Sequence, residues 1–333
     1  MLASATHDTK RGEDTRLKIG LLSEIPGRWT DAVRRWSRMN EPFRCNGCPD
    51  RNTEYFLYQT LAGAWPIGSE RLVPVMLKAV KEAKVHTSWT DPSPAFEADL
   101  ERFIERIMGH EMFTSDLAAF LAPLDWPAVV SSLSQTLIKC TAPGVPDIYQ
   151  GAELWDLSLV DPDNRRPVDF RRRQRWLADA LRLSCAEVLE RREEGLPKLF
   201  LLQRVLAMRR RYAEAFGPEG SYLPLTADGV LANRLVAFMR GEKAITLAPR
   251  LVVGLDDDWQ GTVVQLPPGV WENAFSGERF RGGVQKLPPE VSKFQQDVLP
   301  AWQGRSTHWH ALWSEAFFQE MEGSGLSFAE IAD

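Results

Sequence analysis

Apolar residues recur every three or four positions through most of residues 14–141, and this spacing limits what the chain can fold into more than any other feature. The spacing places apolar side chains on one side of a helix, and that side must pack against a core. Pro26-Gly27 and Ser93-Pro94 divide the stretch, since a helix ends before a proline and tolerates one in its first turn. We therefore predict a mostly helical region, with helices over about 14–25, 69–85, 94–107 and 126–141.

The pattern changes after residue 142. Residues 143–151 are too short and too interrupted by Pro and Gly for a helix, and they predict a short buried strand. Two long basic helices are expected after it, over about 170–194 and 197–215. From about residue 221 the sequence predicts a small antiparallel sandwich, with short β-rich runs at 234–239, 244–247 and 262–266. After about residue 300 it predicts helix again, through Trp302, Trp309, Trp313, Phe317 and Phe318.

Charge and composition exclude several classes of protein. The 333 residues include 40 Lys and Arg against 45 Asp and Glu, a net charge of −5, which argues against a basic nucleic-acid-binding protein. No run of about 18–20 uninterrupted apolar residues predicts a membrane helix, and the N-terminus lacks the basic start and apolar run of a secretory signal. The four cysteines are too few and too scattered for a disulfide scaffold. We therefore expect a cytoplasmic protein with neither a membrane nor a nucleic-acid partner.

Two residue types remain open to more than one interpretation. Cys45-Asn-Gly-Cys48 has the spacing of half a zinc site or of a redox pair, but no second CxxC or His pair lies nearby to complete four ligands. A surface loop is the favoured interpretation, and no metal site is predicted. The twelve Trp residues could form platforms for sugar rings, although a core position is the commoner role for any one of them.

The densest group of reactive side chains is His7-Asp-Thr-Lys-Arg-Gly-Glu-Asp14, with one His, three carboxylates and two cations ahead of a predicted helix. Such a group is either a functional site or a capped helix start. Asp8 or Thr9 could cap the helix, and the negative charges of Glu13 and Asp14 would interact favourably with its positive N-terminal end. The polar run Asp161-Pro-Asp-Asn-Arg-Arg166 is likewise compatible with a plain turn.

Four motifs occur in one order along the chain: Thr6-His-Asp-Thr-Lys-Arg-Gly-Glu-Asp14; Pro49-Asp-Arg-Asn-Thr-Glu-Tyr-Phe-Leu-Tyr-Gln-Thr-Leu61 with Gly63-Ala-Trp-Pro66; Pro143-Gly-Val-Pro-Asp-Ile-Tyr-Gln-Gly-Ala-Glu153; and Asp161-Pro-Asp-Asn-Arg-Arg-Pro-Val-Asp169. Together they resemble the maltooligosyltrehalose synthase family of the α-amylase superfamily. The resemblance covers roughly residues 3–275 and corresponds only to the C-terminal part of that family.

The resemblance implies an α+β fold. Residues 1–220 would be the C-terminal portion of an amylase-type (β/α)8 barrel with a long helical insertion. Residues 221–300 would be an antiparallel β-sandwich domain, and residues 301–333 a divergent Trp-rich tail. His7 and Asp8 would follow barrel strand seven, and residues 145–149 would form strand eight.

The implied activity is an intramolecular transglucosylation, in which the reducing-end α-1,4 bond of a maltooligosaccharide becomes an α,α-1,1 bond. Asp8 would stabilise the transition state by binding hydroxyls of the distorting sugar, and His7 would hold the same sugar. Lys10 and Arg11 would neutralise Asp8 or contact the acceptor sugar. The other substrate-binding residues that the motifs imply are Tyr149, Gln150, Glu153, Asp161 and Arg165. The chemistry requires no metal or organic cofactor.

The sequence departs from the superfamily pattern in one serious respect. The nucleophilic Asp and the acid Glu follow barrel strands four and five, and no Arg-x-Asp-His motif of that kind occurs here. Strands one to six are missing as well, and two strands cannot close a barrel. We therefore expect a fragment that needs an N-terminal barrel half from another chain, with a non-catalytic remnant or a glucan-binding module as the alternative. An independent hydrolase is disfavoured because no carboxylate pair is placed for it.

Overall fold

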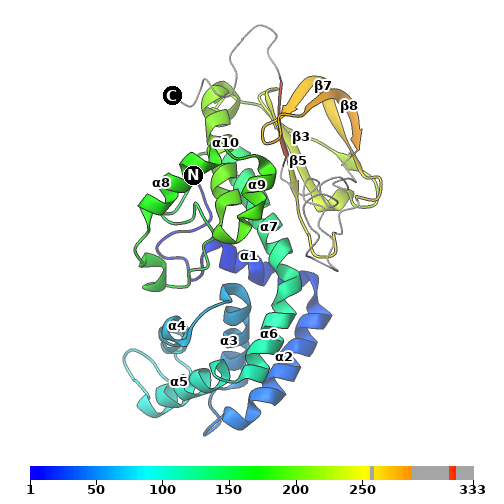
Figure 1. The fold of residues 1–333 in the computed structure, drawn as a ribbon. Coiled ribbons are helices and arrows are strands. Elements are labelled where there is room, and N and C mark those ends of the chain that lie inside the picture. Colours follow the sequence, from blue (N-terminus) through cyan, green and yellow to red (C-terminus); the bar gives the residue numbers. More distant parts are fainter. Residues whose placement is uncertain (256–258, 287–314, 320–333) are drawn as a thin grey trace.

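The computed structural model describes residues 1–255, 259–286 and 315–319, which form a helical region joined to an antiparallel sheet (Figure 1). The helices are α1 (Glu13–Leu21), α2 (Pro26–Asn40), α3 (Arg51–Ala64), α4 (Ser69–Ala83), α5 (Pro94–Met108), α6 (Glu111–Leu121), α7 (Asp125–Thr141), α8 (Phe170–Ala180), α9 (Cys185–Glu190), α10 (Leu196–Arg211) and α11 (Ala213–Phe216). The strands are β1 (Leu2–Ala3), β2 (Pro146–Asp147), β3 (Tyr222–Pro224), β4 (Ala227–Asp228), β5 (Leu235–Arg240), β6 (Ala244–Pro249), β7 (Val263–Asn273), β8 (Arg279–Lys286) and β9 (Glu315–Gln319).

The helices begin where the sequence supplies starting residues. Pro26 and Pro94 occupy the first turns of α2 and α5, where a missing N–H costs nothing. Asp50 caps α3, because its side chain accepts the backbone N–H groups of Asn52 and Thr53. The apolar spacing of residues 14–141 is confirmed as a set of separate helices. Three of the four predicted helices match within two residues, whereas α1 ends at Leu21, four residues before the predicted end, and is continued by a 3₁₀ turn over Leu22–Glu24.

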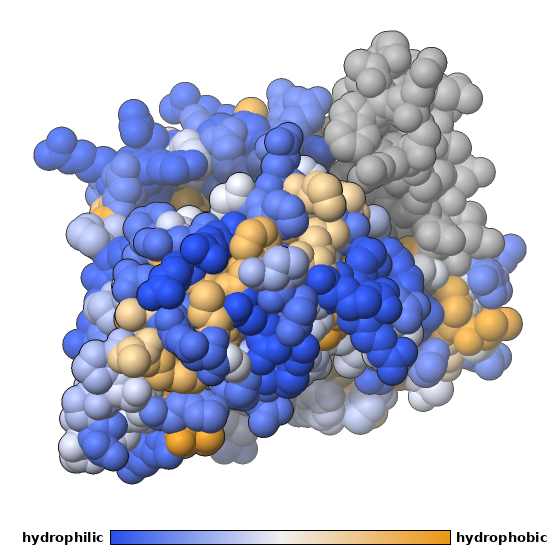
Figure 2. All heavy atoms as spheres, turned by 90° about the horizontal axis from the view of Figure 1, so that it is seen from below, coloured by the Kyte–Doolittle hydropathy of each residue, from blue (hydrophilic) through white to orange (hydrophobic). Residues whose placement is uncertain are grey.

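The helical region has an aromatic core. Trp36 is fully buried and meets Tyr58, Phe113 and Phe120 edge-on, with ring centroids 5.3–6.0 Å apart. Trp29 packs against the same group. These two tryptophans are therefore core residues rather than sugar platforms. On the outer face of this region, hydrophilic residues surround smaller hydrophobic patches (Figure 2).

One stretch meets the length and hydropathy of a membrane-spanning helix. It is Glu111–Thr141, through α6 and α7, with a mean hydropathy of 1.3 in its most apolar window, of which 44% is buried inside the chain. Length and composition are the only grounds for this match. Because α7 packs against α1, α10 and β6, its apolar residues also have partners within the protein.

The strands form two sheets. Strands β1 and β2 pair in parallel, Leu2 beside Pro146 and Ala3 beside Asp147. The second sheet has the order β3-β5-β6-β9-β7-β4, with β8 also paired to β7, and its pairs are antiparallel. A register shift between Leu266 and Val270 bends the long strand β7, which lets one end pair with β4 and the other with β9. Helices α7 and α10 lie between this sheet and α8 (Figure 1).

Three sequence predictions about the elements need correction. The helix predicted over 170–194 is broken at residues 181–184, because the side chain of Ser184 caps a new helix in a capping box with Glu187. Within the buried strand predicted over 145–149 only Pro146–Asp147 is β, and these two residues are half-buried. Phe317 and Phe318, predicted as helical, lie in strand β9, where backbone pairing between β6 and β7 overrides local preference. The other tail residues named above lie outside the described ranges.

Candidate active site

The loop of residues 5–12, which we call the motif loop, joins β1 to α1 and carries the His7-Asp8 pair. Thr6 and Thr9 hold it in a turn, because the Thr9 hydroxyl donates to the Thr6 carbonyl at 2.7 Å and accepts the Thr6 N–H at 3.3 Å. His7 and Asp8 point outward from this turn. Their side chains are 61% and 82% exposed, with Nε2 of His7 3.1 Å from Oδ2 of Asp8.

The capping interpretation of Asp8 and Thr9 is wrong. The N-cap of α1 is Gly12, which has no side chain to offer, and no side-chain hydrogen bond caps this helix. Asp8 therefore stabilises no helix end, and among the described residues the partner of its carboxylate is His7. The Asp8 carboxylate is thus exposed, caps no helix and lies beside His7.

Lys10 and Arg11 turn away from Asp8 toward the helical insertion. Nζ of Lys10 lies 2.7 Å from Oε2 of Glu82 on α4. The Arg11 guanidinium lies 4.9 Å from the centroid of the Phe56 ring on α3, a cation–π distance, and burial lowers its pKa. The two cations thus tie the motif loop to α3 and α4 in this structure, and neither neutralises Asp8.

Residues 156–166 form a second loop, here called the DPDN loop, which lies directly against the motif loop. The Asn164 side-chain amide donates to the His7 carbonyl at 2.9 Å, and Arg11 pairs with Leu159 as an isolated antiparallel bridge. On this loop Asp161 is paired with Arg165, Nε to Oδ1 2.7 Å. The structure therefore brings Asp161 and Arg165 into the same neighbourhood as His7 and Asp8.

The base of the DPDN loop is fixed by an ion pair between a half-buried Arg71 and a buried Asp163. Arg71 of α4 donates twice to Asp163, at 2.8 and 2.9 Å, and donates again to the Leu157 carbonyl. Burial raises the pKa of Asp163, but the bonds from Arg71 and from the Leu159 N–H outweigh it, so the pKa is lowered. The loop is thus ordered by the insertion helix rather than being a plain turn.

The three remaining predicted residues follow strand β2. Glu153 accepts from the Gly151 N–H at 3.0 Å and from Arg173 at 2.9 Å, so its carboxylate is already paired. Tyr149 is half-buried and Gln150 is exposed. They are connected to the motif loop through the β1–β2 pair, where the Leu2 N–H donates to the Val145 carbonyl. No described hydrogen bond joins their side chains to His7 or Asp8.

Sequence reasoning missed a buried group of charges behind the motif loop. Glu13 and Asp14, predicted to act on the helix end, are buried in ion pairs with Lys139 of α7 and Lys198 of α10. The signal was present in the sequence, because each lysine stands alone in an apolar helical run. A buried lysine of this kind requires an acidic partner.

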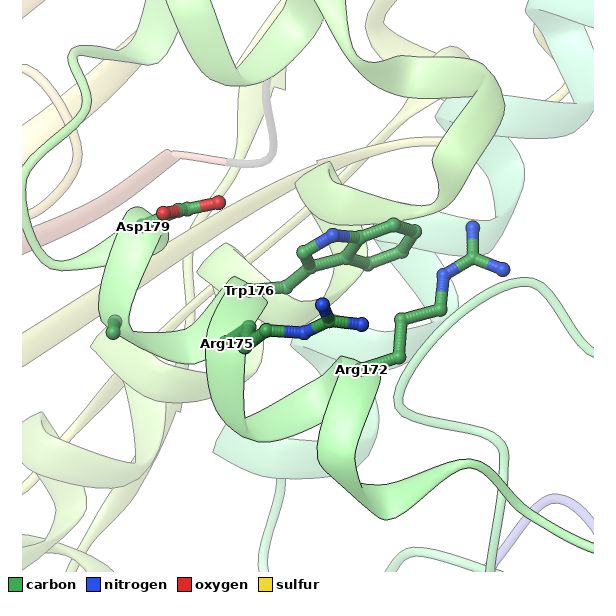
Figure 3. A pocket seen from close by; sticks show the side chains of 5 residues that line it. Arg172, Arg175, Trp176 and Asp179 are labelled. Carbon is green, nitrogen blue, oxygen red and sulfur yellow. The ribbon is translucent and has the colours of Figure 1, made fainter.

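A hollow on α8 is separate from these loops. Its volume is about 560 Å³, and Figure 3 shows Trp176 beside Arg172 and Arg175, with Asp179 on the next turn. The Arg172 guanidinium lies 3.9 Å from the centroid of the Trp176 ring. None of the predicted site residues lines this hollow.

No group of three or more His, Cys, Asp and Glu side chains in the described part of the chain could hold a metal ion. Cys45 and Cys48 form a tight hairpin with two backbone hydrogen bonds and are both free thiols. Burial raises the pKa of Cys48 to about 12, so this thiol is a poor metal ligand.

The chain was compared with family models, with curated proteins and with solved structures. No family model matches the chain. Proteins named maltooligosyl trehalose synthase from two Mycobacterium tuberculosis strains are 38% identical over 285 residues, which is 83% of this chain and 34% of theirs. The chain therefore spans about a third of the length of the curated relatives it matches.

Solved structures agree. Maltooligosyltrehalose synthase from Arthrobacter ramosus matches 95% of this chain with 38% of its own, at 35% identity and a TM-score of 0.76. A hypothetical maltooligosyl trehalose synthase from Sulfolobus tokodaii matches 86% of this chain with 37% of its own, at 32% identity and a TM-score of 0.70. These matches confirm the resemblance that the four motifs indicated, for a part of such a protein.

Proposed function

We propose that this chain supplies the sugar-binding C-terminal part of a maltooligosyltrehalose synthase. One observation carries the proposal: His7 and Asp8 are exposed side by side on the motif loop, where Asp8 has no helix to cap. The ordered motifs and the matches over most of the chain support the same function.

The reaction would convert the reducing-end α-1,4 bond of a maltooligosaccharide into an α,α-1,1 bond. Such a step requires a nucleophilic carboxylate and a carboxylic acid on either side of the bond, with an oxocarbenium-like transition state between them. Asp8 would bind the hydroxyls of the distorting sugar, and a charge-assisted hydrogen bond there strengthens as the transition state forms. The nucleophile and the acid would come from the rest of the enzyme.

The fold fits this assignment when β1 and β2 are taken as neighbouring strands of a (β/α)8 barrel. They are parallel, and α1 to α7 form the long connection between them. Eight strands are needed to close such a barrel, so the remaining six would come from outside this sequence. The sheet from β3 onward would be the sandwich domain of amylase-type enzymes.

Helix α8 offers a surface for that barrel half. Of its eleven residues only Ala180 is buried, although helices normally owe their stability to a packed face. Phe170, Leu177 and Leu181 follow one another at helical spacing and are 56%, 39% and 45% exposed. We assign this stripe, together with the open edges of β1 and β2, to contact with the missing half.

The first prediction is that the isolated chain does not catalyse the reaction. Without the nucleophile no covalent intermediate forms, and no binding contact compensates for that loss. Incubation with maltopentaose should leave the number of reducing ends unchanged relative to a blank. Adding the N-terminal barrel part of a homologue should restore the loss of reducing ends. Steady turnover by the chain alone contradicts the assignment, and failure of the assembled protein favours a non-catalytic glucan-binding role.

The second prediction concerns Asp8. In the assembled enzyme, Asp8→Asn should remove transition-state stabilisation of about 3–4 kcal/mol, or roughly a hundred- to a thousandfold in turnover. The thermal midpoint should stay the same, because the exposed carboxylate caps nothing. Turnover within about threefold of the parent would remove Asp8 from the site, and a collapsed midpoint would make it structural.

A further inference from the structure

The motif loop is closed at its base by buried and partly buried hydrogen bonds. Ser4 precedes the loop and Glu13 follows it, and the Ser4 hydroxyl donates directly to Oε2 of Glu13. Nζ of Lys139, from α7, donates to both, at 2.7 Å to the Ser4 hydroxyl and 3.1 Å to Glu13. The two ends of the loop that carries His7 and Asp8 are therefore joined to each other and to a core helix.

The same group of charges also holds the DPDN loop. Nζ of Lys198, fully buried on α10, pairs with Glu13 and lies 2.9 Å from Oδ2 of Asp14. That Asp14 oxygen accepts the backbone N–H of Asp156 at 2.6 Å, at the start of the DPDN loop. One lysine thus bridges the anchors of both loops.

Stability alone is a weak account of four buried charges. Desolvation of a buried ion pair costs about as much as the attraction returns, and apolar side chains of similar volume are often as stable. A buried ion cluster does, however, fix geometry. Each buried charge needs partners at hydrogen-bond distance, so the segments that carry those partners are held in one relative position. Burial by itself raises the pKa of Glu13, yet Lys198, Lys139 and the Ser4 hydroxyl bring it to about 2, so the carboxylate stays charged.

We propose that Glu13, Asp14, Lys139 and Lys198, the buried ion cluster, are positioning residues that fix the motif loop and the DPDN loop against each other. The cluster sets where Asp8 stands relative to Asp161 and Arg165, without touching the sugar. The inference rests on the proposed function of Asp8, but the geometry that it asserts is measurable without catalysis.

Hydrogen exchange on the whole chain tests this geometry. The double variant Glu13→Gln/Lys139→Met keeps the net charge and opens the loop base, so the peptide spanning residues 5–12 should exchange about tenfold faster. Peptides from α4 and α5 should keep their rates. The matched control is Arg35→Met/Asp116→Asn, which removes an ion pair between α2 and α6 and should leave residues 5–12 unchanged. If the double variant fails to fold, Ser4→Ala removes only the bridging hydroxyl and should give a smaller acceleration in the same peptide.

A second measurement separates this proposal from the proposed function. In the assembled enzyme the double variant should lower kcat by at least about tenfold with KM nearly unchanged, because the transition-state contact is displaced rather than the substrate lost. Unchanged exchange in residues 5–12, or equal acceleration throughout the chain, overturns the positioning role whatever the activity. If exchange in residues 5–12 is accelerated but Asp8→Asn leaves turnover unchanged, the proposed function of Asp8 is contradicted and the positioning role is retained.

Discussion

Gly12 is a residue at which the motif loop lies directly against the DPDN loop. Its N–H donates to the Ser158 carbonyl at 2.7 Å, and a Cβ at this position would lie 2.6 Å from Oδ2 and 2.7 Å from the carbonyl oxygen of Asp156. The backbone dihedrals of Gly12 are ordinary, so glycine is needed here for space and not for conformation. The carbonyl cannot swing aside as a side chain would, and the two loops must separate to admit a methyl group.

Replacing Gly12 by Ala should therefore destabilise the chain by about 1–3 kcal/mol, as overpacking against backbone does. Gly20, exposed within α1, is the matched control because a Cβ there meets nothing within 4 Å. Gly20→Ala should stabilise by up to about 1 kcal/mol through helix propensity. Urea unfolding of both variants checks the opposite signs, and a Gly12→Ala variant as stable as the parent would contradict the close approach of the loops.

Glu13 gives the chain an acid-dependent stability. Its pKa is lowered from 4.5 to about 2, so its charged form stabilises the fold above the unfolded value and this contribution fades as the pH falls toward 2. Relative to the protonated carboxyl, the charged form of Glu13 is favoured in the folded state by about 3 kcal/mol, which is a pH-dependent difference and not the net stability of the ion cluster. In urea unfolding, the stability difference between the parent and Glu13→Gln should shrink steadily between about pH 5 and pH 2. A difference that stays constant over this range would show that the Glu13 charge has no special environment.

Helix boundaries could be predicted from the sequence where a single residue determines them. Pro26 and Pro94 mark helix starts because proline has a fixed dihedral and no N–H to lose. The break before α9 was also readable, since Ser184 and Glu187 have the spacing of a capping box. It was overlooked because the surrounding basic residues continue a helical pattern without interruption.

Strands were harder to predict, because a strand depends on its partner. Strand β2 is only Pro146–Asp147, and what makes it a strand is β1, which lies some 140 residues earlier in the chain. Strand β9 is inserted between β6 and β7, a placement that aromatic residues in a Trp-rich segment cannot disclose.

In the candidate site, the residues could be predicted from the sequence, but their contacts with distant helices could not. The motifs identified the residues of both loops by type and spacing, and the structure shows those loops in contact. The partners of Lys10 and Arg11 on α3 and α4 were not predictable, because they depend on how the insertion folds back over the motif loop. The roles of His7, Asp8 and the other predicted site residues remain predictions.

The whole molecule has an uneven distribution of charge and exposed apolar surface. Its net charge is −5, yet residues 165–192 carry nine Arg against four Asp and Glu. The apolar stripe Phe170, Leu177 and Leu181 lies within this basic segment. In the described part of the chain, β1 and β2 pair only with each other, so each keeps one open edge. Basic, apolar and unpaired surfaces of this kind each favour contact with another protein surface.

We therefore predict that the isolated chain self-associates at micromolar concentration. Exposed apolar patches of a few hundred Å² favour association, and open strand edges add to them. Light scattering should show species larger than a monomer, and Leu177→Asn/Leu181→Asn should reduce their fraction. Val230→Asn, at a more exposed apolar residue outside the stripe (74% exposed), is the control and should change nothing.

Two additions to the light-scattering experiment, salt and the homologous N-terminal barrel part, identify which interaction drives self-association. If the apolar stripe dominates, association should persist at about 0.5 M salt, where attraction between exposed charges is largely screened. Addition of the homologous N-terminal barrel part should replace self-association by a defined heterodimer, because both would compete for α8 and the open strand edges. A compact monomer at micromolar concentration that ignores the added barrel part would instead identify the chain as self-sufficient, and α8 as a surface helix without a partner.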